Sequence, residues 1–232
     1  MRFGHAPAIW AQFPQLVPGV LHVGGIHSNA DVPALIEPLY ARARERLARG
    51  PESELAEISA WRRAYTQMGL KPTQYRSAAE ALLRRLRRED DLPRLHPLVD
   101  LGNALSLAFA LPVAIFDLAG VEAFLEVRHA AGGEEHAGFS GETERAEPGE
   151  IIFADGAGHA HARRWTFRQS RRSTVTADTR EVLIVVEGLH GTAASDVAAL
   201  LDALATHITG CWGAPQQRAV LTAASPQIEL PA

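Results

Sequence analysis

The residues best suited to chemistry lie in an apolar run from Leu95 to Leu118. This run has only two acidic residues, Asp100 and Asp117, and it contains one amide side chain, Asn103. A buried amide needs partners, because leaving it unpaired costs roughly 1–3 kcal/mol. Together with neighbouring backbone N–H groups, such an amide can donate hydrogen bonds to an oxyanion, where removing one donor costs about 100-fold or more in rate. The alternative is a core helix followed by a buried strand, with Asn103 satisfied locally.

A second set of chemically capable side chains follows in the segment HAHARRWTFRQ, residues 159–169. If Ala162–Gln169 is a strand, its period of two divides the side chains between two faces. One face carries Arg164, Thr166 and Arg168, and the other carries Arg163, Trp165, Phe167 and Gln169. The first face can clamp phosphates by bidentate contacts, and the second can stack a base. The alternative places Trp165 and Phe167 in the core beneath solvated arginines.

The pair His159-x-His161 raises the question of a metal, because alternate residues of a strand point the same way. Pro148-Gly149-Glu150 and this histidine pair resemble the two metal motifs of cupins, in reversed order. No glutamate follows His161 at ligand spacing; Arg164 and Trp165 stand there, and cationic neighbours oppose a divalent ion. We therefore expect no metal and no cofactor, and a cupin-like small-molecule enzyme is the weakest of the alternatives.

Composition indicates an ordinary globular protein, with 47% hydrophobic and 22% charged residues. The net charge of −4 argues against a protein that coats nucleic acid through its overall field. We find neither a signal-peptide pattern at the N-terminus nor an uninterrupted apolar run of membrane-spanning length, so we expect a cytoplasmic protein without a membrane partner. The single cysteine, Cys211, leaves no disulfide within the chain and is expected to pack in the interior.

Arginine is strongly preferred over lysine, since Lys71 is the only lysine among 23 basic residues. The arginines form three groups, of which the first two fit solvated helix faces. The third group surrounds the aromatic segment described above and calls for a further reason. The groups are Arg42, Arg44, Arg46 and Arg49; Arg84, Arg85, Arg87 and Arg88; and Arg163, Arg164, Arg168, Arg171 and Arg172.

The elements that must position these side chains begin with a strand and a glycine turn at Gly19–His27. Apolar spacing predicts helices over residues 35–47 and 55–65, the second ending at Gly69. A third helix starts at Ser77, where Ser77-Ala-Ala-Glu80 has the pattern of a capping box. The preceding residues 71–76 contain a proline and are expected to form an ordered loop.

The second half of the sequence is predicted to be rich in strands, at residues 122–129, 151–153, 162–169 and 182–186. A helix over Ala193–Ile208, capped by Thr192 or Ser195, follows them, and residues 223–232 form an extended tail. The predicted class is α+β, with a mostly antiparallel sheet or sandwich flanked by helices. We expect one domain over residues 1–232, with a helical part at 33–92 and a β-rich, pocket-bearing part at 93–210.

One motif in this sequence resembles a known family. Val99-Asp100-x-x-Asn103, a helical spacer and then Pro112-x-x-x-Phe116-Asp117-Leu118 is similar to the editing region, the B3/B4 unit, in the β subunit of bacterial phenylalanyl-tRNA synthetase. The likeness extends from about Lys71 to Gly188, and the run Lys71–Ser77 resembles that of freestanding relatives of the unit. The resemblance implies the fold of that editing unit and a solitary editing or tRNA-acceptor-binding domain, without aminoacylation activity of its own.

In that family the pocket takes the aminoacylated 3′ end of tRNA and hydrolyses the ester of a wrongly attached amino acid, as a second sieve. The resemblance matches Asn103 to the pocket amide and Glu187 to the pocket carboxylate. Gly102 stands where the family has a small hydroxyl residue, and Ala114 where it has a histidine. The catalytic candidates are Asn103, Glu187 and His161; the substrate- and tRNA-binding candidates are Gly102, Ala114, Arg163, Arg164, Trp165 and Arg168.

Two roles stay open for Glu187 and two for the protein. The Glu187 carboxylate can bind the substrate's ammonium group or position water, or it can be a strand-end carboxylate paired with a neighbouring arginine. The leading hypothesis is trans-editing hydrolysis of mischarged aminoacyl-tRNA, with tRNA and not DNA as the partner. Because Ala114 replaces the family histidine, the alternative is a tRNA acceptor-binding module that does not catalyse.

Overall fold

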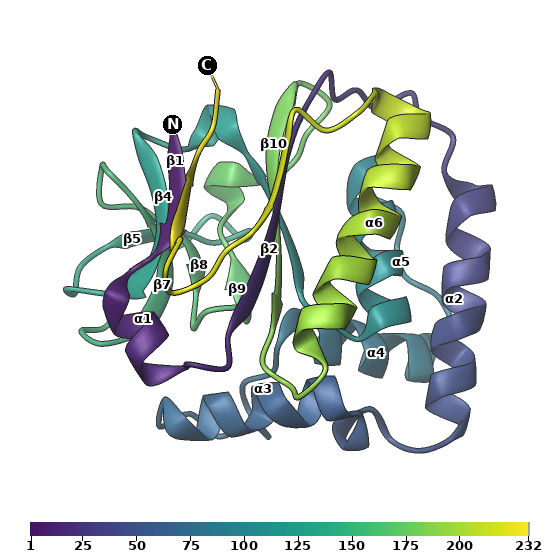
Figure 1. Ribbon diagram of the computed structural model, residues 1–232, viewed down its shortest axis with the longest axis horizontal. Helices are drawn as coiled ribbons and strands as arrows, with labels where there is room; N and C mark the ends of the chain where they lie inside the picture. Colours follow the sequence, from purple (N-terminus) through teal and green to yellow (C-terminus); the bar gives the residue numbers. More distant parts are fainter. Residues whose placement is uncertain (232) are drawn as a thin grey trace.

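The computed structural model describes residues 1–231, in which a group of helices, α2 to α5, precedes a group of strands, β3 to β10 (Figure 1). The helices are α1 (Pro7–Gln12), α2 (Pro33–Ala48), α3 (Ala56–Gln67), α4 (Ala78–Glu89), α5 (Pro97–Phe109) and α6 (Ala193–Trp212). The strands are β1 (Arg2–His5), β2 (Val17–Gly24), β3 (Val113–Asp117), β4 (Phe124–His129), β5 (Glu135–Ala137), β6 (Thr143–Arg145), β7 (Ile151–Asp155), β8 (Ala160–Arg163), β9 (Arg168–Gln169), β10 (Glu181–Gly188), β11 (Gln217–Val220) and β12 (Gln227–Glu229).

These elements form three layers. A six-stranded sheet of order β12-β1-β4-β7-β8-β9 is one outer layer, and a four-stranded sheet of order β11-β2-β10-β3 lies in the middle. Figure 1 shows α2, α4, α5 and α6 on the far side of the middle sheet, with α3 beneath both sheets. All strand pairs are antiparallel except β1 with β4. The predicted α+β class with mostly antiparallel sheets and flanking helices is confirmed.

The middle sheet is buried on both faces, which explains the continuous apolar run of β10. Ile184 and Val186 face the helices, whereas Leu183 and Val185 face the six-stranded sheet. This alternation is the period of two expected of a strand. Glu187 continues the second set, so its carboxylate is directed into the space between the two sheets.

The start of α4 forms one of the two hydrogen bonds of the predicted capping box. The Ser77 hydroxyl oxygen accepts the backbone N–H of Glu80 at 3.3 Å. The Glu80 carboxylate accepts a hydrogen bond from the Arg62 guanidinium at 2.7 Å, which ties α4 to α3.

The helix that carries Asn103 begins and ends at well-defined residues. His96 is its N-cap, where Nδ1 accepts the backbone N–H of Leu98 at 3.2 Å, and Pro97 occupies the first turn. The helix ends at Ala110, whose φ of 55° is left-handed. The predicted core helix followed by a strand in the run Leu95–Leu118 is therefore confirmed as α5 and β3.

The predicted single strand over Ala162–Gln169 is wrong. The segment is a hairpin in which β8 ends at Arg163 and β9 begins at Arg168. Arg164 and Trp165 have φ values of 48° and 60°, and this left-handed backbone turns the chain. The predicted division of its side chains between two strand faces is wrong for the same reason.

The ends of the chain complete the two sheets. The predicted C-terminal helix is α6, which continues four residues beyond the expected Ile208, and the predicted extended tail contains β12, paired with β1. Figure 1 shows the two termini close together. In the part of the chain that the structure describes, no helix combines the length and the apolar character needed to cross a membrane.

A glycine sets the distance between α6 and the middle sheet. A Cβ on Gly19 of β2 would lie 2.7 Å from side-chain atoms of both Val197 and Leu201. We expect Gly19→Ala to lower the free energy of unfolding by about 1–3 kcal/mol through overpacking, measured by urea denaturation. Gly191→Ala is the matched control, because a Cβ there would meet nothing within 4 Å. Equal stability of the two variants would contradict this packing.

Candidate functional site

Several of the candidate side chains lie near the free edge of β3. This strand is the last of the middle sheet and, within residues 1–231, pairs only with β10. Gln169 covers part of the open edge, since its Nε2 donates to the Ile115 carbonyl oxygen at 2.7 Å. Because backbone groups two residues apart point the same way along a strand, the N–H and carbonyl of Val113 also face this edge.

A cavity of about 550 Å³ lies on the helix side of this edge. The walls are α5, β3 and the residues 174–177 that follow the short 3₁₀ helix η3 (Arg171–Ser173). None of the described side chains that line it is Asp, Glu, Lys or Arg. Two exposed large apolar side chains stand at its rim, Leu95 with 69% and Phe139 with 62% of the surface exposed. The cavity therefore offers hydrogen bonds and apolar contact, and no formal charge.

Asn103 and Gly102 both line this larger cavity. Asn103 is half-buried, and its amide forms no hydrogen bond with the residues that the structure describes. The local satisfaction that we considered as the alternative is thus not found, and the amide is free to bind a ligand. A Cβ on Gly102 would lie 2.7 Å from Cδ1 of Ile115, so glycine lets α5 approach β3 closely.

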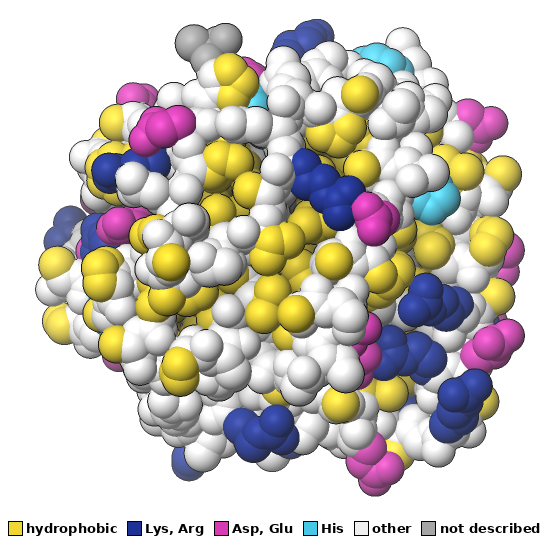
Figure 2. Space-filling view, in the orientation of Figure 1, with side chains coloured by type: hydrophobic (Ala, Val, Ile, Leu, Met, Phe, Trp, Pro, Cys, Tyr) yellow, Lys and Arg dark blue, Asp and Glu magenta, His cyan; other side chains and the backbone are white. Residues whose placement is uncertain are grey.

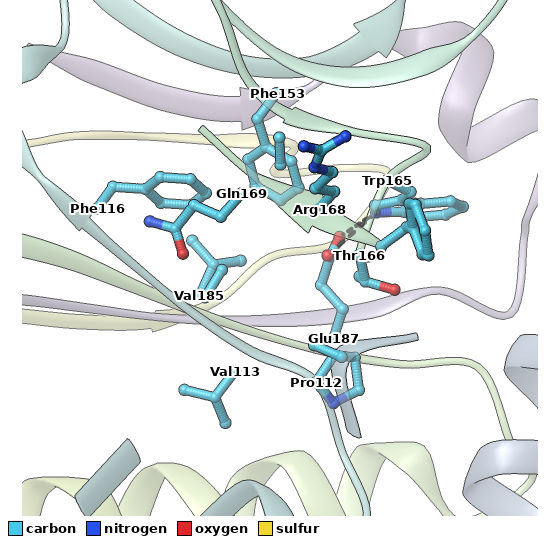
Figure 3. A pocket seen from close by; sticks show the side chains of 14 residues that line it. Pro112, Val113, Phe116, Phe153, Trp165, Thr166, Arg168, Gln169, Val185 and Glu187 are labelled. Carbon is cyan, nitrogen blue, oxygen red and sulfur yellow. Dashed lines mark hydrogen bonds between the residues drawn. The ribbon is translucent and has the colours of Figure 1, made fainter. Parts of the chain in front are cut away.

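A smaller cavity of about 60 Å³ lies on the other side of β3, between the two sheets. Ala114, Trp165, Phe167, Arg168 and Glu187 contribute to its lining, and Figure 3 labels Trp165, Arg168 and Glu187 among them. A water molecule needs about 10–15 Å³ of such space, so this cavity suits a few waters and not an aminoacyl group. Val113 and Gln169 line both cavities and separate them.

The carboxylate of Glu187 is buried, and its hydrogen-bond partners in the described residues do not include an arginine. Its Oε1 lies 2.7 Å from Nε2 of His5, and the Trp165 indole N–H donates to both carboxylate oxygens at 2.9 and 3.0 Å. Figure 3 shows the carboxylate reaching the indole. Only 2% of Glu187 is exposed, so these donors are what stabilise its buried carboxylate. The alternative that paired Glu187 with a neighbouring arginine is wrong, because its partners are His5 and Trp165.

His161 lies away from both cavities. It is fully buried, with Nδ1 2.9 Å from the Ser173 hydroxyl and Nε2 3.1 Å from Asp155 Oδ2. Burial lowers the pKa of His161 below its ordinary value, although the hydrogen bond to Asp155 acts in the opposite direction. Asn103, Glu187 and His161 therefore do not converge: the first two line adjoining cavities and the third belongs to another cluster.

The arginines of the hairpin are engaged by acidic side chains. Arg163 is buried and bonds Glu150 through Nε at 2.9 Å and Nη2 at 2.7 Å, and Arg168 bonds Glu144 and Glu142 at 2.8 Å each. The guanidinium of Arg164 stacks on aromatic rings, and Trp165 is fully buried, as in the alternative that places it in the core. The phosphate clamp and the stacking face predicted for a single strand over residues 162–169 are therefore absent from the described residues.

Positive and negative side chains are interspersed elsewhere too. On the face seen in Figure 2, Lys and Arg side chains are densest over the helices at the right and lie among Asp and Glu. Within the described part of the chain, six of the eight arginines in the first two groups pair with acidic residues, such as Arg44 with Asp90 and Arg87 with Glu52, and Arg42 and Arg49 do not. In the third group, Arg171 and Arg172 are likewise exposed, and neither has a carboxylate oxygen within 4.0 Å in residues 1–231.

Sequence reasoning missed several residues of the larger cavity. His96 lines it next to the start of α5, and burial lowers the pKa of its imidazole. His96-Pro97 at a helix start was a usable signal, because proline favours the first helical position. Phe139 and residues 174–177 reach the cavity only through the fold, and no sequence pattern marks them.

Comparisons with known proteins identify the central part of the chain. Residues 60–205 match the family model of the B3/4 domain. Among solved structures, an N-terminal fragment of the phenylalanyl-tRNA synthetase beta-subunit from Pyrococcus horikoshii is similar with a TM-score of 0.46 and 11% identity over 94% of this chain. The chain spans 53% of that fragment. No curated protein matches this sequence.

The ion pairs around Arg163 give a testable pH dependence. Burial alone would raise the pKa of Glu150, but the hydrogen-bonded Arg163 guanidinium outweighs it and lowers the pKa below its ordinary value. A depressed carboxyl pKa contributes stability above the unfolded-state pKa, and this stability is lost as pH falls through the folded-state pKa. We expect Glu150→Gln to reduce the loss of unfolding free energy between about pH 5 and pH 3, measured by urea denaturation at each pH. The exposed Glu45→Gln serves as control, and equal pH slopes for the two variants would contradict the role of this pair.

Proposed function

The chain belongs to the B3/4 domain family, and from this premise we propose that it hydrolyses mischarged aminoacyl-tRNA in trans. The aminoacylated 3′-terminal adenosine binds in the larger cavity beside β3, and water cleaves the ester to a free amino acid and tRNA. The observation that carries the proposal is the unpartnered amide of Asn103 in a cavity of about 550 Å³. That volume lies in the range of roughly 300–1,000 Å³ usual for ligand sites.

Hydrolysis at this site depends on orientation and on oxyanion stabilisation. An aminoacyl ester is already activated, so a held water and hydrogen-bond donors to the oxyanion suffice. The Asn103 amide supplies such a donor. The cavity lining contains no carboxylate, and Nδ1 of His96 already accepts the Leu98 N–H, so neither provides a general base. The bound ester is therefore attacked by water that the site holds in place.

The substrate's ammonium group finds neutral acceptors here. The carbonyl of Val113 faces the free edge of β3, and the hydroxyls of Thr174 and Thr176 line the same cavity. Three N–H bonds of an ammonium group can be met by such oxygens. His5 and Trp165 engage both carboxylate oxygens of Glu187. We therefore infer that Glu187 positions the wall of the cavity and does not contact the substrate.

We assign the tRNA backbone a basic contact next in sequence to the residues that line this cavity. Arg171 and Arg172 are exposed on η3, directly before the cavity-lining Thr174. Arginines without a carboxylate partner are available to phosphates, and each phosphate contact adds affinity that falls with salt. Local contact of this kind is compatible with the overall charge of −4.

Binding without turnover is the second candidate, because Ala114 and the uncharged cavity supply no acid or base. The cupin-like alternative receives no support, since the chain belongs to the B3/4 domain family.

Asn103→Ala tests the reaction directly. We expect the wild-type protein to deacylate at least one member of a panel of mischarged tRNAs faster than buffer, and Asn103→Ala to slow this by about 100-fold or more. The readout is the release of labelled amino acid. Asn29→Ala, at the only other asparagine and exposed, should retain the wild-type rate. A full panel that stays intact contradicts the hydrolase, and tRNA binding in that case selects the second candidate.

Replacing both Arg171 and Arg172 by alanine tests the phosphate contact. We expect weaker tRNA binding and a salt dependence of log K that is shallower by about 0.7 for each phosphate that the protein no longer neutralises, measured by filter binding across salt concentrations. Arg85→Ala is the matched control, because Arg85 is exposed but paired with Glu89 at 2.7 Å. An unchanged salt slope in the double variant places the tRNA elsewhere on the protein.

A further inference from the structure

A cluster of three potential metal ligands lies at the turn between β7 and β8, outside both cavities. Asp155 ends β7, His161 lies in β8, and His159 precedes it. Oδ2 of Asp155 is 3.0 Å from Nδ1 of His159 and 3.1 Å from Nε2 of His161. The three ligand atoms all lie within 4.8 Å of one another. None of these residues has a part in the proposed hydrolysis.

The separations suit a single metal ion. With metal–ligand distances near 2.0–2.2 Å, two ligands of one zinc ion lie roughly 2.8–3.6 Å apart for coordination angles from about 90° to the tetrahedral angle. The two carboxylate–imidazole separations fall inside this interval. Two imidazoles and a carboxylate are a ligand set that divalent transition metals favour, and three protein ligands leave a position for solvent.

Surrounding groups hold the ligands in these orientations. The Ser173 hydroxyl lies 2.9 Å from Nδ1 of His161, so it can accept that N–H while Nε2 binds a metal. Oδ1 of Asp155 accepts the backbone N–H groups of Ala157 at 3.0 Å and His159 at 2.9 Å, while Oδ2 accepts the Glu122 N–H at 3.2 Å and faces both histidines. Asp155 and His161 are fully buried and the side chain of His159 is 18% exposed, so an ion can enter past His159.

In the folded protein, Arg163 and Arg164 do not oppose a metal ion at this cluster, contrary to what the sequence indicated. The guanidinium of Arg163 is held by Glu150 and Glu144, and that of Arg164 lies over the Tyr75 ring at 4.7 Å. Arg172 is the cationic neighbour that remains, and it is exposed. The Asp155 carboxylate and the two imidazoles can therefore bind a cation without repulsion from a buried, unpaired arginine.

We propose that Asp155, His159 and His161 bind a divalent transition-metal ion through Oδ2, Nδ1 and Nε2. The ion joins the β7–β8 turn to η3, because Ser173 of η3 orients one of the ligands. Binding of this kind stabilises the folded state by mass action, since the unfolded chain does not preserve the site.

Zinc titration of the untagged, chelator-treated full chain tests the site. We expect one Zn²⁺ per chain by calorimetry and a higher Tm with Zn²⁺ but not with Mg²⁺, which prefers oxygen ligands. His159→Ala should abolish saturable binding without loss of fold, because this side chain is partly exposed. Ser173→Ala should weaken binding about tenfold, the loss usual for an outer hydrogen-bond partner. The absorption spectrum of the Co²⁺ form reports histidine ligation independently.

A second group, Glu57, His190 and Asp196, supplies the control, since its atoms are also close enough to share an ion. Its Glu57 is already paired with Arg46, so we expect Asp196→Asn to leave Zn²⁺ affinity unchanged. Two results overturn the proposal. One is the absence of both heat and Tm shift at millimolar Zn²⁺, and the other is binding that survives His159→Ala but is abolished in Asp196→Asn.

Discussion

The relative placement of the two sheets depends on the hydrogen bonds that the buried carboxylate of Glu187 accepts. This carboxylate belongs to β10 of the middle sheet and is held by His5 of β1 and by the Trp165 indole, both from the six-stranded layer. A buried carboxylate is tolerable only where donors replace water, and hydrogen bonds to charged groups are worth about 1.5–3 kcal/mol each. The fold therefore fixes the hairpin after β8 against β10, and Gln169 of that hairpin then reaches the edge of β3.

The free edge of β3, which Gln169 partly covers, is central to the proposed function. The two faces of β3 line different cavities, a larger uncharged one beside α5 and a smaller one next to Glu187. Close approach of α5 at Gly102 brings Asn103 to the larger cavity with its amide free. A site without ionised lining groups favours recognition by hydrogen bonds and shape over charge, and in the proposed function the contact with tRNA phosphates is assigned to Arg171 and Arg172 of η3, outside the cavity.

Local signals in the sequence predicted local structure well. The cap at Ser77 and the apolar run of β10 gave elements that the structure contains, because hydrogen bonds and burial within a few residues decide them. The hairpin in residues 162–169 was missed, since Arg164 and Trp165 adopt left-handed φ values without being glycine or asparagine. The partners of Glu187 were missed for another reason. His5 is 182 residues away in the sequence, and only the strand order of the complete sheets brings the two together. Asn103 was singled out as the one amide in an apolar run and matched to the pocket amide by resemblance, and its free amide could only be seen in the fold.

The most direct test of the central claim is an NMR titration with a non-hydrolysable 3′-aminoacylamino analogue of the terminal adenosine. The chain has two asparagines, Asn29 and Asn103, so the side-chain amide signal of Asn103 can be assigned by a single substitution. We predict saturable shifts of that signal and of the backbone amides of Gly102 and Val113, which line the larger cavity. Shifts that saturate elsewhere on the protein while these three signals stay in place would contradict the account.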